Sequence, residues 1–379
     1  MSVLITRRES LFGMAAAPVA FARATRPARR QHGVAFHYQA HFAPRQVEWY
    51  TRFEILVTGA ILTAEQTAPL RRGPKLVAYE WSSGFYQGDA VSAPLDWQRS
   101  VESQGQRMLL TARPVTGASA ENGRLAQWYD FGSDELINHR AAFLADRLVR
   151  AGYDGYFFDT IGDQCLPADV LAAFKRRHPG MDYNQRQGLF LQSLRAMLPA
   201  GKLIFLNQGY RHAEHLLRHA DLDLSESYFT FLAGAGTGFR PWHDTAKPWE
   251  SVRTPMEKLI APALRQFPGV RMIHANYAAG AAVDVARARR YSLACARLFG
   301  QEAYTIVPGA PVSEEDDHYA ADLGKPIGPL TEDPAQAVAW RPFERGVVAV
   351  NGGPKPARIA ALNQTLPDAF QGYVFRQGT

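Results

Sequence analysis

The chain has 379 residues, of which 46% are hydrophobic, so it can bury the core of one large α/β domain with an appendage, or of two domains. Its formal charge of +6 comes in part from arginines near the N-terminus, and no basic helix or lysine-rich run follows them. This distribution argues against nucleic acid as a partner. The two cysteines, Cys165 and Cys295, lie in unlike contexts, and we expect two unpaired structural thiols.

Residues 1–24 have the layout of an export signal. Arg7 and Arg8 precede an apolar stretch over 11–22, which is short for a membrane span, and the small-x-small sequence ARA follows. The arginine pair resembles a twin-arginine signal; a disordered basic N-terminus is the alternative. We expect a soluble mature protein that begins near Thr25, has no membrane span, and is exported to the periplasm or the extracellular space.

After residue 30, short β-branched or aromatic runs alternate with longer amphipathic runs. The short runs predict strands over 33–38, 54–59, 75–81, 154–159, 202–208, 222–228, 270–277 and 302–307. The longer runs predict helices, among them 45–53, 133–152, 184–199 and 284–300. Strands that are apolar on both faces and alternate with helices indicate a parallel sheet.

The helix over 133–152 has recognisable ends. Ser133 is placed to be its N-cap, and Gly152 is placed to end it. Its apolar face is formed approximately by Leu136, Ala142, Phe143, Leu148 and Val149.

Eight strand–helix units over residues 31–328 match a (β/α)8 TIM barrel in number and length, a fold of the α/β class. A doubly wound open sheet is the alternative, but the first strand runs into FHYQAHFAP, which lacks a G-x-G-x-x-G turn. Two long insertions, 82–132 and 229–251, follow the C-terminal ends of strands, where barrel loops build active sites. Residues 329–379 are predicted to form a small β-rich C-terminal appendage.

Polar side chains occur at or near the C-terminal ends of these strands, and in a barrel such ends meet at one mouth. They are Tyr38, Glu80, Asp159, Asn207, Gln208, Glu226, Asn276, Tyr277 and Tyr304. Buried carboxylates are costly unless they are hydrogen-bonded or used. Acids among amides and phenols, without a lysine or histidine at the strand tips, indicate acid/base or nucleophilic carboxylate chemistry.

Glycoside hydrolysis needs such an arrangement, because one carboxylic acid protonates the leaving oxygen while a carboxylate attacks the sugar or activates water. Asp159 and Glu226 lie two strands apart, and their side chains can face each other across roughly 5 to 10 Å, a range that covers retaining and inverting enzymes. We predict Asp159 as the nucleophile or base and Glu226 as the general acid/base, with no cofactor. Structural roles are the alternatives: a cap of the following turn for Asp159 and a salt bridge for Glu226.

Substrate-binding roles are predicted for other residues at the strand ends around this pair. We assign them to Tyr38, Glu80, Trp81, Asn207, Gln208, Asn276 and Tyr277. Five of the seven tryptophans lie at the end of the third strand or in the insertions: Trp81, Trp97, Trp128, Trp242 and Trp249. Since aromatic rings dock on the C–H faces of sugars, we expect tryptophans to line an oligosaccharide groove, with packing of the insertions as the alternative for one or two.

No metal site is predicted. His37 and His41 lie on a strand-to-loop segment where their rings need not converge, and His274 lies within the seventh strand. Ser225 lacks a G-x-S-x-G elbow, which argues against a serine triad. The acidic run over 313–319 is expected to be a solvated loop, and attraction of cationic sugars is the alternative.

The segment RAGYDGYFFDTIG over 150–162 resembles the G-[FY]-D-G-x-[FL]-x-D signature of a TIM-barrel superfamily of glycosidases. This superfamily includes endo-α-1,4-polygalactosaminidases and related hypothetical glycosyl hydrolases. The segments KLVAYEWSSG, LNQG, SESYF, DLGKPIG and WRPFERGVVAVNGGP are similar to its third, fifth and sixth strands and its closing segment, so the likeness covers about residues 33–355. The resemblance implies that Asp159 and Glu226 are the catalytic pair. Thr160 stands where many members have asparagine, and Glu80 and Trp81 replace smaller residues, so the substrate stays open.

The sequence therefore predicts an exported TIM-barrel glycoside hydrolase that acts on an oligo- or polysaccharide. Two alternatives stay open, a carbohydrate-binding barrel without catalysis and a polysaccharide lyase.

Overall fold

A computed structural model describes residues 33–39, 41–70, 73–90, 92–110, 126–233, 237–241, 248–278, 282–307 and 322–376. The predicted export signal, Trp242 and the acidic run over 313–319 lie outside these residues.

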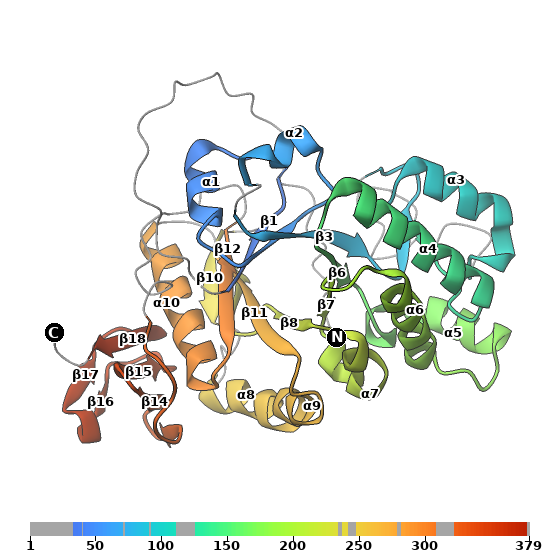
Figure 1. The fold of residues 1–379 in the computed structure, drawn as a ribbon. Coiled ribbons are helices and arrows are strands. Elements are labelled where there is room, and N and C mark those ends of the chain that lie inside the picture. The colour runs from blue at the N-terminus through green and yellow to red at the C-terminus, as the bar shows by residue number, and fades with distance from the viewer. Residues whose placement is uncertain are drawn as a thin grey trace.

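Eight parallel strands form one sheet in the order β1-β2-β3-β6-β7-β8-β11-β12. They are β1 (Val34–His37), β2 (Ile55–Thr58), β3 (Lys75–Trp81), β6 (Gly155–Asp159), β7 (Leu203–Asn207), β8 (Leu222–Glu226), β11 (Arg271–Tyr277) and β12 (Glu302–Ile306). Strand β12 lies against β1, so the sheet curls into a nearly closed barrel with helices around it (Figure 1). The predicted TIM barrel is confirmed, and each of the eight predicted strands is present within two residues of its expected ends.

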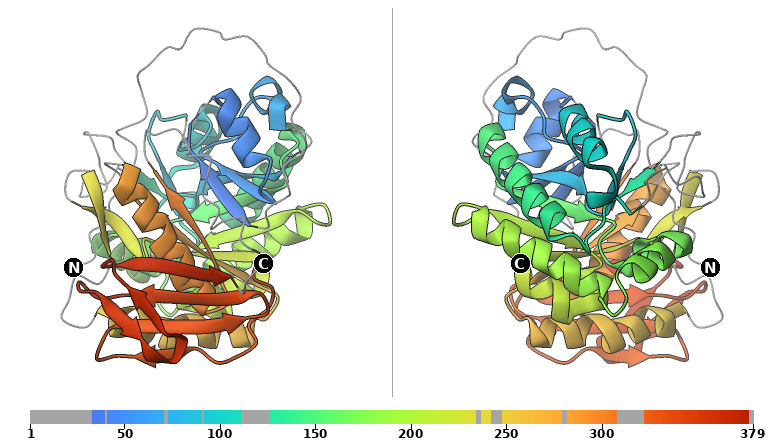
Figure 2. Two further views of the ribbon diagram at one scale, coloured as in Figure 1. Left: turned by 90° about the vertical axis from the view of Figure 1, so that its left-hand side faces the viewer. Right: turned by 90° about the vertical axis from the view of Figure 1, so that its right-hand side faces the viewer.

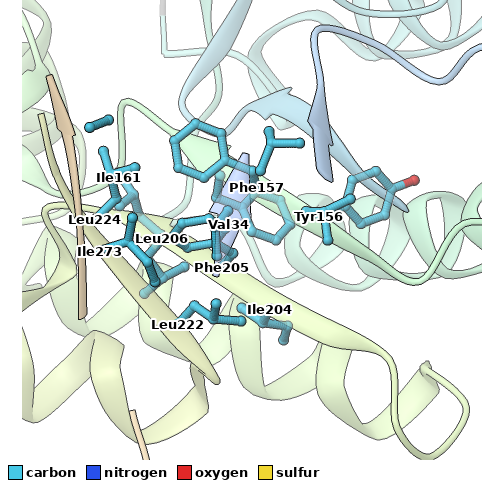
Figure 3. Close-up of a cluster of buried hydrophobic side chains, with 14 of the residues drawn as sticks. Val34, Tyr156, Phe157, Ile161, Ile204, Phe205, Leu206, Leu222, Leu224 and Ile273 are labelled. Atoms are coloured by element: carbon cyan, nitrogen blue, oxygen red, sulfur yellow. The ribbon is translucent and has the colours of Figure 1, made fainter. Parts of the chain in front are cut away.

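Aromatic side chains fill the barrel interior. Phe157 of β6 is in register with Tyr79 of β3 and with Phe205 of β7. The ring centroids of Phe157 and Phe205 lie 4.8 Å apart, and Figure 3 shows both rings in this cluster. Phe36 of β1 lies 5.9 Å from Phe157 and also 5.9 Å from Tyr304 of β12, across the closure. Because side chains alternate between the two faces of a strand, this core determines which residues of each strand face inward.

Helices cover the outside of the barrel. They are α1 (Pro44–Tyr50), α2 (Ala64–Thr67), α4 (Asp134–Ala151), α5 (Ala168–Arg177), α6 (Tyr183–Met197), α7 (Ala213–Leu216), α9 (Ala261–Gln266) and α10 (Ala282–Leu298). The predicted ends of α4 are confirmed, because Ser133 Oγ accepts a hydrogen bond from the amide of Leu136 and Gly152 adopts a left-handed φ of 70°. None of the described helices is both long and apolar enough to cross a bilayer.

The buried face of α4 differs from the predicted one. Ala142 and Val149 were expected to be buried and instead face solvent. The helix buries a row spaced by four residues, Leu136, Arg140, Leu144 and Leu148. Arg140 belongs to this buried row although it is charged, because its guanidinium is fully buried against Glu80.

The two insertions contain small hairpins and extra helices. The first has β4 (Gly84–Tyr86) paired with β5 (Ala126–Trp128), together with α3 (Leu95–Gln104). The second has β9 (Thr230–Ala233) paired with β10 (Thr237–Pro241), followed by α8 (Pro248–Pro255) and a π-helical turn over Met256–Ile260. Both insertions leave from the C-terminal ends of barrel strands, as predicted.

The C-terminal appendage is antiparallel. It contains the sheet β13-β14-β15-β18 and the hairpin β16-β17, formed by β13 (Thr331–Asp333), β14 (Val338–Phe343), β15 (Gly346–Asn351), β16 (Ala357–Ile359), β17 (Gln364–Leu366) and β18 (Gln371–Arg376). One face of the sheet packs on α10 (Figure 2). The other face shares a small core with the hairpin, made by Val338, Ala349, Ala357, Ile359 and Leu366. The β-rich appendage is therefore confirmed.

Gly372 allows β18 to pack closely on α10. A Cβ atom at this position would overlap the carbonyl oxygen of Arg290 and the side chain of Ala294. Overpacking of this kind costs about 1 to 3 kcal/mol, so Gly372→Ala should lower the free energy of unfolding in urea by that amount. Gly269→Ala is the matched control, because its added Cβ would meet no atom within 4 Å. Equal stability of the two variants would contradict this packing.

Candidate active site

Three neighbouring strands each end in a polar side chain that faces the barrel interior. Asp159 ends β6, Asn207 ends β7 and Glu226 ends β8. Each is an even number of residues from an inward-facing side chain of its own strand, so all three point to the same side of the sheet. Asp159 and Glu226 are half-buried, whereas Asn207 is 5% exposed. The acids are therefore reached by solvent at the mouth, and the amide lies beneath them.

The side-chain amide of Asn207 connects the two acids. Its Nδ2 donates one hydrogen bond of 2.7 Å to Asp159 Oδ1 and another of 2.9 Å to Glu226 Oε2. The orientation of the amide follows from these partners, because a carboxylate oxygen can only accept. Two oxygens bonded to one nitrogen cannot lie farther apart than the sum of the two distances, about 5.6 Å.

Two tyrosines hold the remaining oxygens of the pair. Tyr79 donates its hydroxyl hydrogen to Asp159 Oδ2 at 2.7 Å, and Tyr277 donates to Glu226 Oε1 at 2.9 Å. Asp159 Oδ1 also accepts from the amide of Thr160 at 2.8 Å, so three donors converge on Asp159. Such donors stabilise negative charge and fix the orientation of the carboxylate.

The residue that follows each of these three strands has a left-handed backbone. The φ angles are 56° at Thr160, 63° at Gln208 and 54° at Ser227. A non-glycine residue in this region costs of order 1 to 3 kcal/mol, and threonine is especially unfavourable because its side chain is β-branched. Strain at three successive strand ends is typical of a functional site that the surrounding structure holds in place.

Of the predicted substrate-binding residues, Tyr38, Asn207 and Tyr277 lie with the two acids. The ring of Tyr38 is half-buried and lies at 90° to that of Tyr79, with 6.2 Å between centroids. The strand-end prediction missed Tyr79. Tyr79 is two residues before Trp81, which is paired with Asp159, so the alternation of β3 would have identified it as inward-facing.

The predicted substrate-binding role of Glu80 is wrong, because its side chain faces away from the mouth. Its register partner on β6 is Phe158, not Asp159, so its side chain points into the helix layer. There it forms ion pairs of 2.9 Å with Arg140 and 3.4 Å with Arg147. Glu80 therefore joins strand β3 to helix α4 and does not line the site.

The predicted substrate-binding role of Asn276 is wrong for the same reason. It is fully buried on the outer face of β11, where its Oδ1 accepts hydrogen bonds from the amides of Phe229 and Thr230. It therefore fixes the start of β9 rather than contacting substrate.

Gln208, which was also predicted to bind substrate, lies at the rim of the barrel, where its Oε1 accepts a 2.7 Å hydrogen bond from Arg211.

Two of the tryptophans expected to contact sugar instead pack inside the first insertion. Trp97 is 2% exposed and donates to the hydroxyl of Tyr129 at 2.8 Å, and Trp128 is 1% exposed. Trp81 packs against Tyr86 and Trp128 with centroids 4.6 and 5.3 Å away. These rings stabilise the insertion, so the alternative of packing holds for Trp97 and Trp128. The side chain of Trp249 lies outside the described residues, like Trp242.

The two strand histidines, His37 and His274, are buried and make hydrogen bonds within the fold. Burial lowers the pKa of His37 to about 4 and that of His274 to about 4. His37 contacts Tyr50 and the carbonyl of His41, and His274 is hydrogen-bonded to Ser225 on the outer face of the barrel. In the part of the chain that the structure describes, no group of three histidine, cysteine or acidic side chains could hold a metal ion.

Both cysteines are free, as predicted. Burial raises the pKa of the Cys165 thiol to about 12, and negative charge on Asp159 and Glu226 contributes to the rise. Cys165 therefore stays protonated near neutral pH.

The family of the chain is shown by comparison with known proteins. Residues 113–347, more than half of the chain, match hypothetical glycosyl hydrolase family 15. The chain belongs to this family. Membership implies a carbohydrate substrate for this family 15 protein. No curated protein matches the chain.

Solved structures of glycoside hydrolases are similar to this family 15 protein. The glycoside hydrolase domain of PelA from Pseudomonas aeruginosa is 20% identical, with a TM-score of 0.50, and the match covers 73% of this chain and 94% of that domain. An isomalto-dextranase from Arthrobacter globiformis T6, solved with panose, is 12% identical with a TM-score of 0.48; the match covers 95% of this chain and 76% of that one. At this level of identity the PelA likeness shows a common fold.

The bridging amide can be tested by substitution. Asn207→Leu keeps a similar shape but removes the donor shared by the two carboxylates, so their separation is no longer fixed. We expect kcat to fall by about 10²-fold, as for a misplacement on the order of 1 Å. Measurements of kcat and of the melting temperature check this expectation.

Asn276→Leu is the matched control, because it removes a buried amide from the outer face of the neighbouring part of the barrel. It leaves two backbone amides without their acceptor, so it should cost about 1 to 3 kcal/mol of stability while the folded enzyme keeps its kcat. An unchanged kcat in Asn207→Leu would contradict the bridging role.

Proposed function

We propose that this protein is a retaining glycoside hydrolase that cleaves O-glycosidic bonds of an oligo- or polysaccharide with Asp159 and Glu226. The observation that carries the proposal is the shared hydrogen-bond donor, Asn207 Nδ2, which keeps the two carboxylates within about 5.6 Å of each other at their bonded oxygens. Family membership supports the hydrolytic class and a carbohydrate substrate.

The separation favours retention over inversion. Retaining enzymes have carboxyl groups about 5 to 5.5 Å apart, because one of them must reach the anomeric carbon directly. Inverting enzymes need about 6.5 to 9.5 Å to admit a water molecule between carboxylate and sugar. Because Asn207 keeps the nearest carboxylate oxygens within about 5.6 Å, the spacing of the pair supports the retaining arrangement over the inverting one.

The hydrogen bonds of Asp159 support different roles for the two acids. Asp159 accepts from Tyr79, Thr160 and Asn207, and these donors suit a group that is charged when it attacks. We therefore assign Asp159 as the nucleophile and Glu226 as the general acid/base.

The reaction then proceeds in two steps. In the first, an Asp159 oxygen bonds to the anomeric carbon while Glu226 gives its proton to the departing glycosidic oxygen. In the second, Glu226 takes a proton from water, the water oxygen bonds to the anomeric carbon, and the bond to Asp159 breaks. The enzyme returns to its starting state, and the product has the configuration of the substrate.

We also propose that the enzyme acts outside the cytoplasm. The support is the N-terminal sequence, in which the pair Arg7-Arg8 precedes a short apolar stretch and a small-x-small ending. Outside the cytoplasm, the enzyme would have access to a polymeric substrate that is too large to enter a cell.

Isosteric substitutions test the catalytic pair. Asp159→Asn and Glu226→Gln should each lower kcat by a factor on the order of 10³ or more, since each removes a group that forms or breaks a bond. The melting temperatures should change by only a few degrees, because the amides keep most of the shape. Release of reducing ends from a panel of polysaccharides gives kcat.

Asp163→Asn is the control, since Asp163 follows the same strand and pairs with His212 at the rim. It should retain activity. Full activity in both Asp159→Asn and Glu226→Gln would rule out the proposed pair. A wild-type protein that releases unsaturated products absorbing in the ultraviolet would instead be a lyase.

A further inference from the structure

Two buried amide side chains on α6 have no part in the chemistry described so far. Asn184 and Gln187 lie three residues apart, on one side of the helix, and are 4% and 0% exposed. A buried primary amide is costly unless its donors and acceptor are satisfied. Their partners therefore indicate what they hold.

Both amides bind the loop that follows Asp159. Gln187 Oε1 accepts a 2.6 Å hydrogen bond from the backbone amide of Gly162, and Asn184 Oδ1 accepts a 2.8 Å hydrogen bond from that of Asp163. Two successive backbone amides of the loop thus depend on one helix face for their acceptors.

Gln187 also acts on the other side of the turn, through Ser83. Its Nε2 donates to Ser83 Oγ at 3.2 Å, and Ser83 in turn donates its hydroxyl hydrogen to the carbonyl oxygen of Thr160. Ser82 donates to the same carbonyl at 3.1 Å. The peptide groups on both sides of Ile161 are therefore held by a network that includes Gln187.

This network stabilises the strained residue next to the proposed nucleophile. Thr160 has a left-handed φ of 56°, which a β-branched residue rarely adopts without support. In that conformation its amide donates to Asp159 Oδ1 at 2.8 Å. If Thr160 relaxes, the amide turns and Asp159 loses one of the donors that orient it.

We propose that Gln187, together with Asn184, is a positioning residue for Asp159, acting through the turn over residues 160–163. This inference rests on the proposed function, since it assigns Gln187 a part in the activity of Asp159. It adds residues that lie on a helix outside the barrel and touch no reacting atom.

Gln187→Met tests the role, because methionine has a similar length but neither accepts from Gly162 nor donates to Ser83. We expect kcat to fall by about 10- to 100-fold with KM nearly unchanged, since a misplaced nucleophile affects the transition state more than substrate binding. Gln192→Met is the control, since Gln192 is an exposed amide on the same helix. It should match the wild type. All assays are run well below the melting temperature of each variant.

Gln187→Glu provides a readout that a merely structural role would not move. A protonated glutamic acid can both accept from Gly162 and donate to Ser83, whereas an ionised one can only accept. The ratio of variant to wild-type kcat should therefore rise as the pH falls through the pKa of the new carboxyl group. A ratio that is independent of pH would count against positioning.

The outcomes separate this inference from the proposed function. An active wild type whose Gln187→Met variant keeps full kcat overturns the positioning role alone. A wild type without hydrolase activity overturns the proposed function, and a crystal structure of Gln187→Met then decides the inference by itself. The expected structure has Thr160 outside the left-handed region and no bond from its amide to Asp159; an unchanged turn overturns the inference.

Discussion

One amide nitrogen with two hydrogens sets the geometry of this site. Asn207 Nδ2 donates to Asp159 on one side and to Glu226 on the other, from the strand that lies between theirs. Adjacent strands are about 4.8 Å apart, so residues two strands apart start roughly 10 Å from each other at the backbone. The inward curvature of the barrel and the bond to a common donor bring the carboxylate oxygens to about half that distance.

The alternation of side chains along a strand explains why two neighbouring acids have different surroundings. Glu80 and Asp159 lie on adjacent strands, but Glu80 is in register with Phe158, one residue before Asp159. One step along a strand reverses the face, so Glu80 lies outside among arginines and Asp159 lies inside among phenols. The outer acid stabilises the contact between β3 and α4, and the inner acid lies at the mouth beside Glu226.

Much of the fold could be predicted because the lengths and spacing of the apolar runs indicate which segments form strands and which form helices. The strands were located within two residues, and the ends of α4 followed from Ser133 and Gly152. The positions of the acids followed from the rule that strand ends meet at one mouth. The prediction was wrong about the face of the strand on which two side chains lie. Glu80 and Asn276 were placed inside the barrel because they are near the ends of their strands. Counting the alternation of side chains from a residue known to face inward would have placed both outside.

Other parts of the site depend on contacts between distant segments. Nothing local in the sequence distinguishes Gln187 from the exposed Gln192, because its partner Ser83 lies 104 residues away. The burial of Arg140 could not be predicted either, because the apolar pattern of α4 carries no sign of its ion pair with Glu80. Trp97 and Trp128 were expected at the sugar because tryptophans in an insertion suit either a groove or a small core, and only packing distinguishes the two.

The central claim is that the spacing fixed by Asn207 makes the two acids a nucleophile and an acid/base rather than a base and an acid separated by water. The most direct measurement is proton NMR of the anomeric configuration of the first product released, recorded before mutarotation. Our account requires the configuration of the cleaved bond to be retained. An inverted first product would show that water enters between carboxylate and sugar, and the close bridging by Asn207 could not then describe the working enzyme.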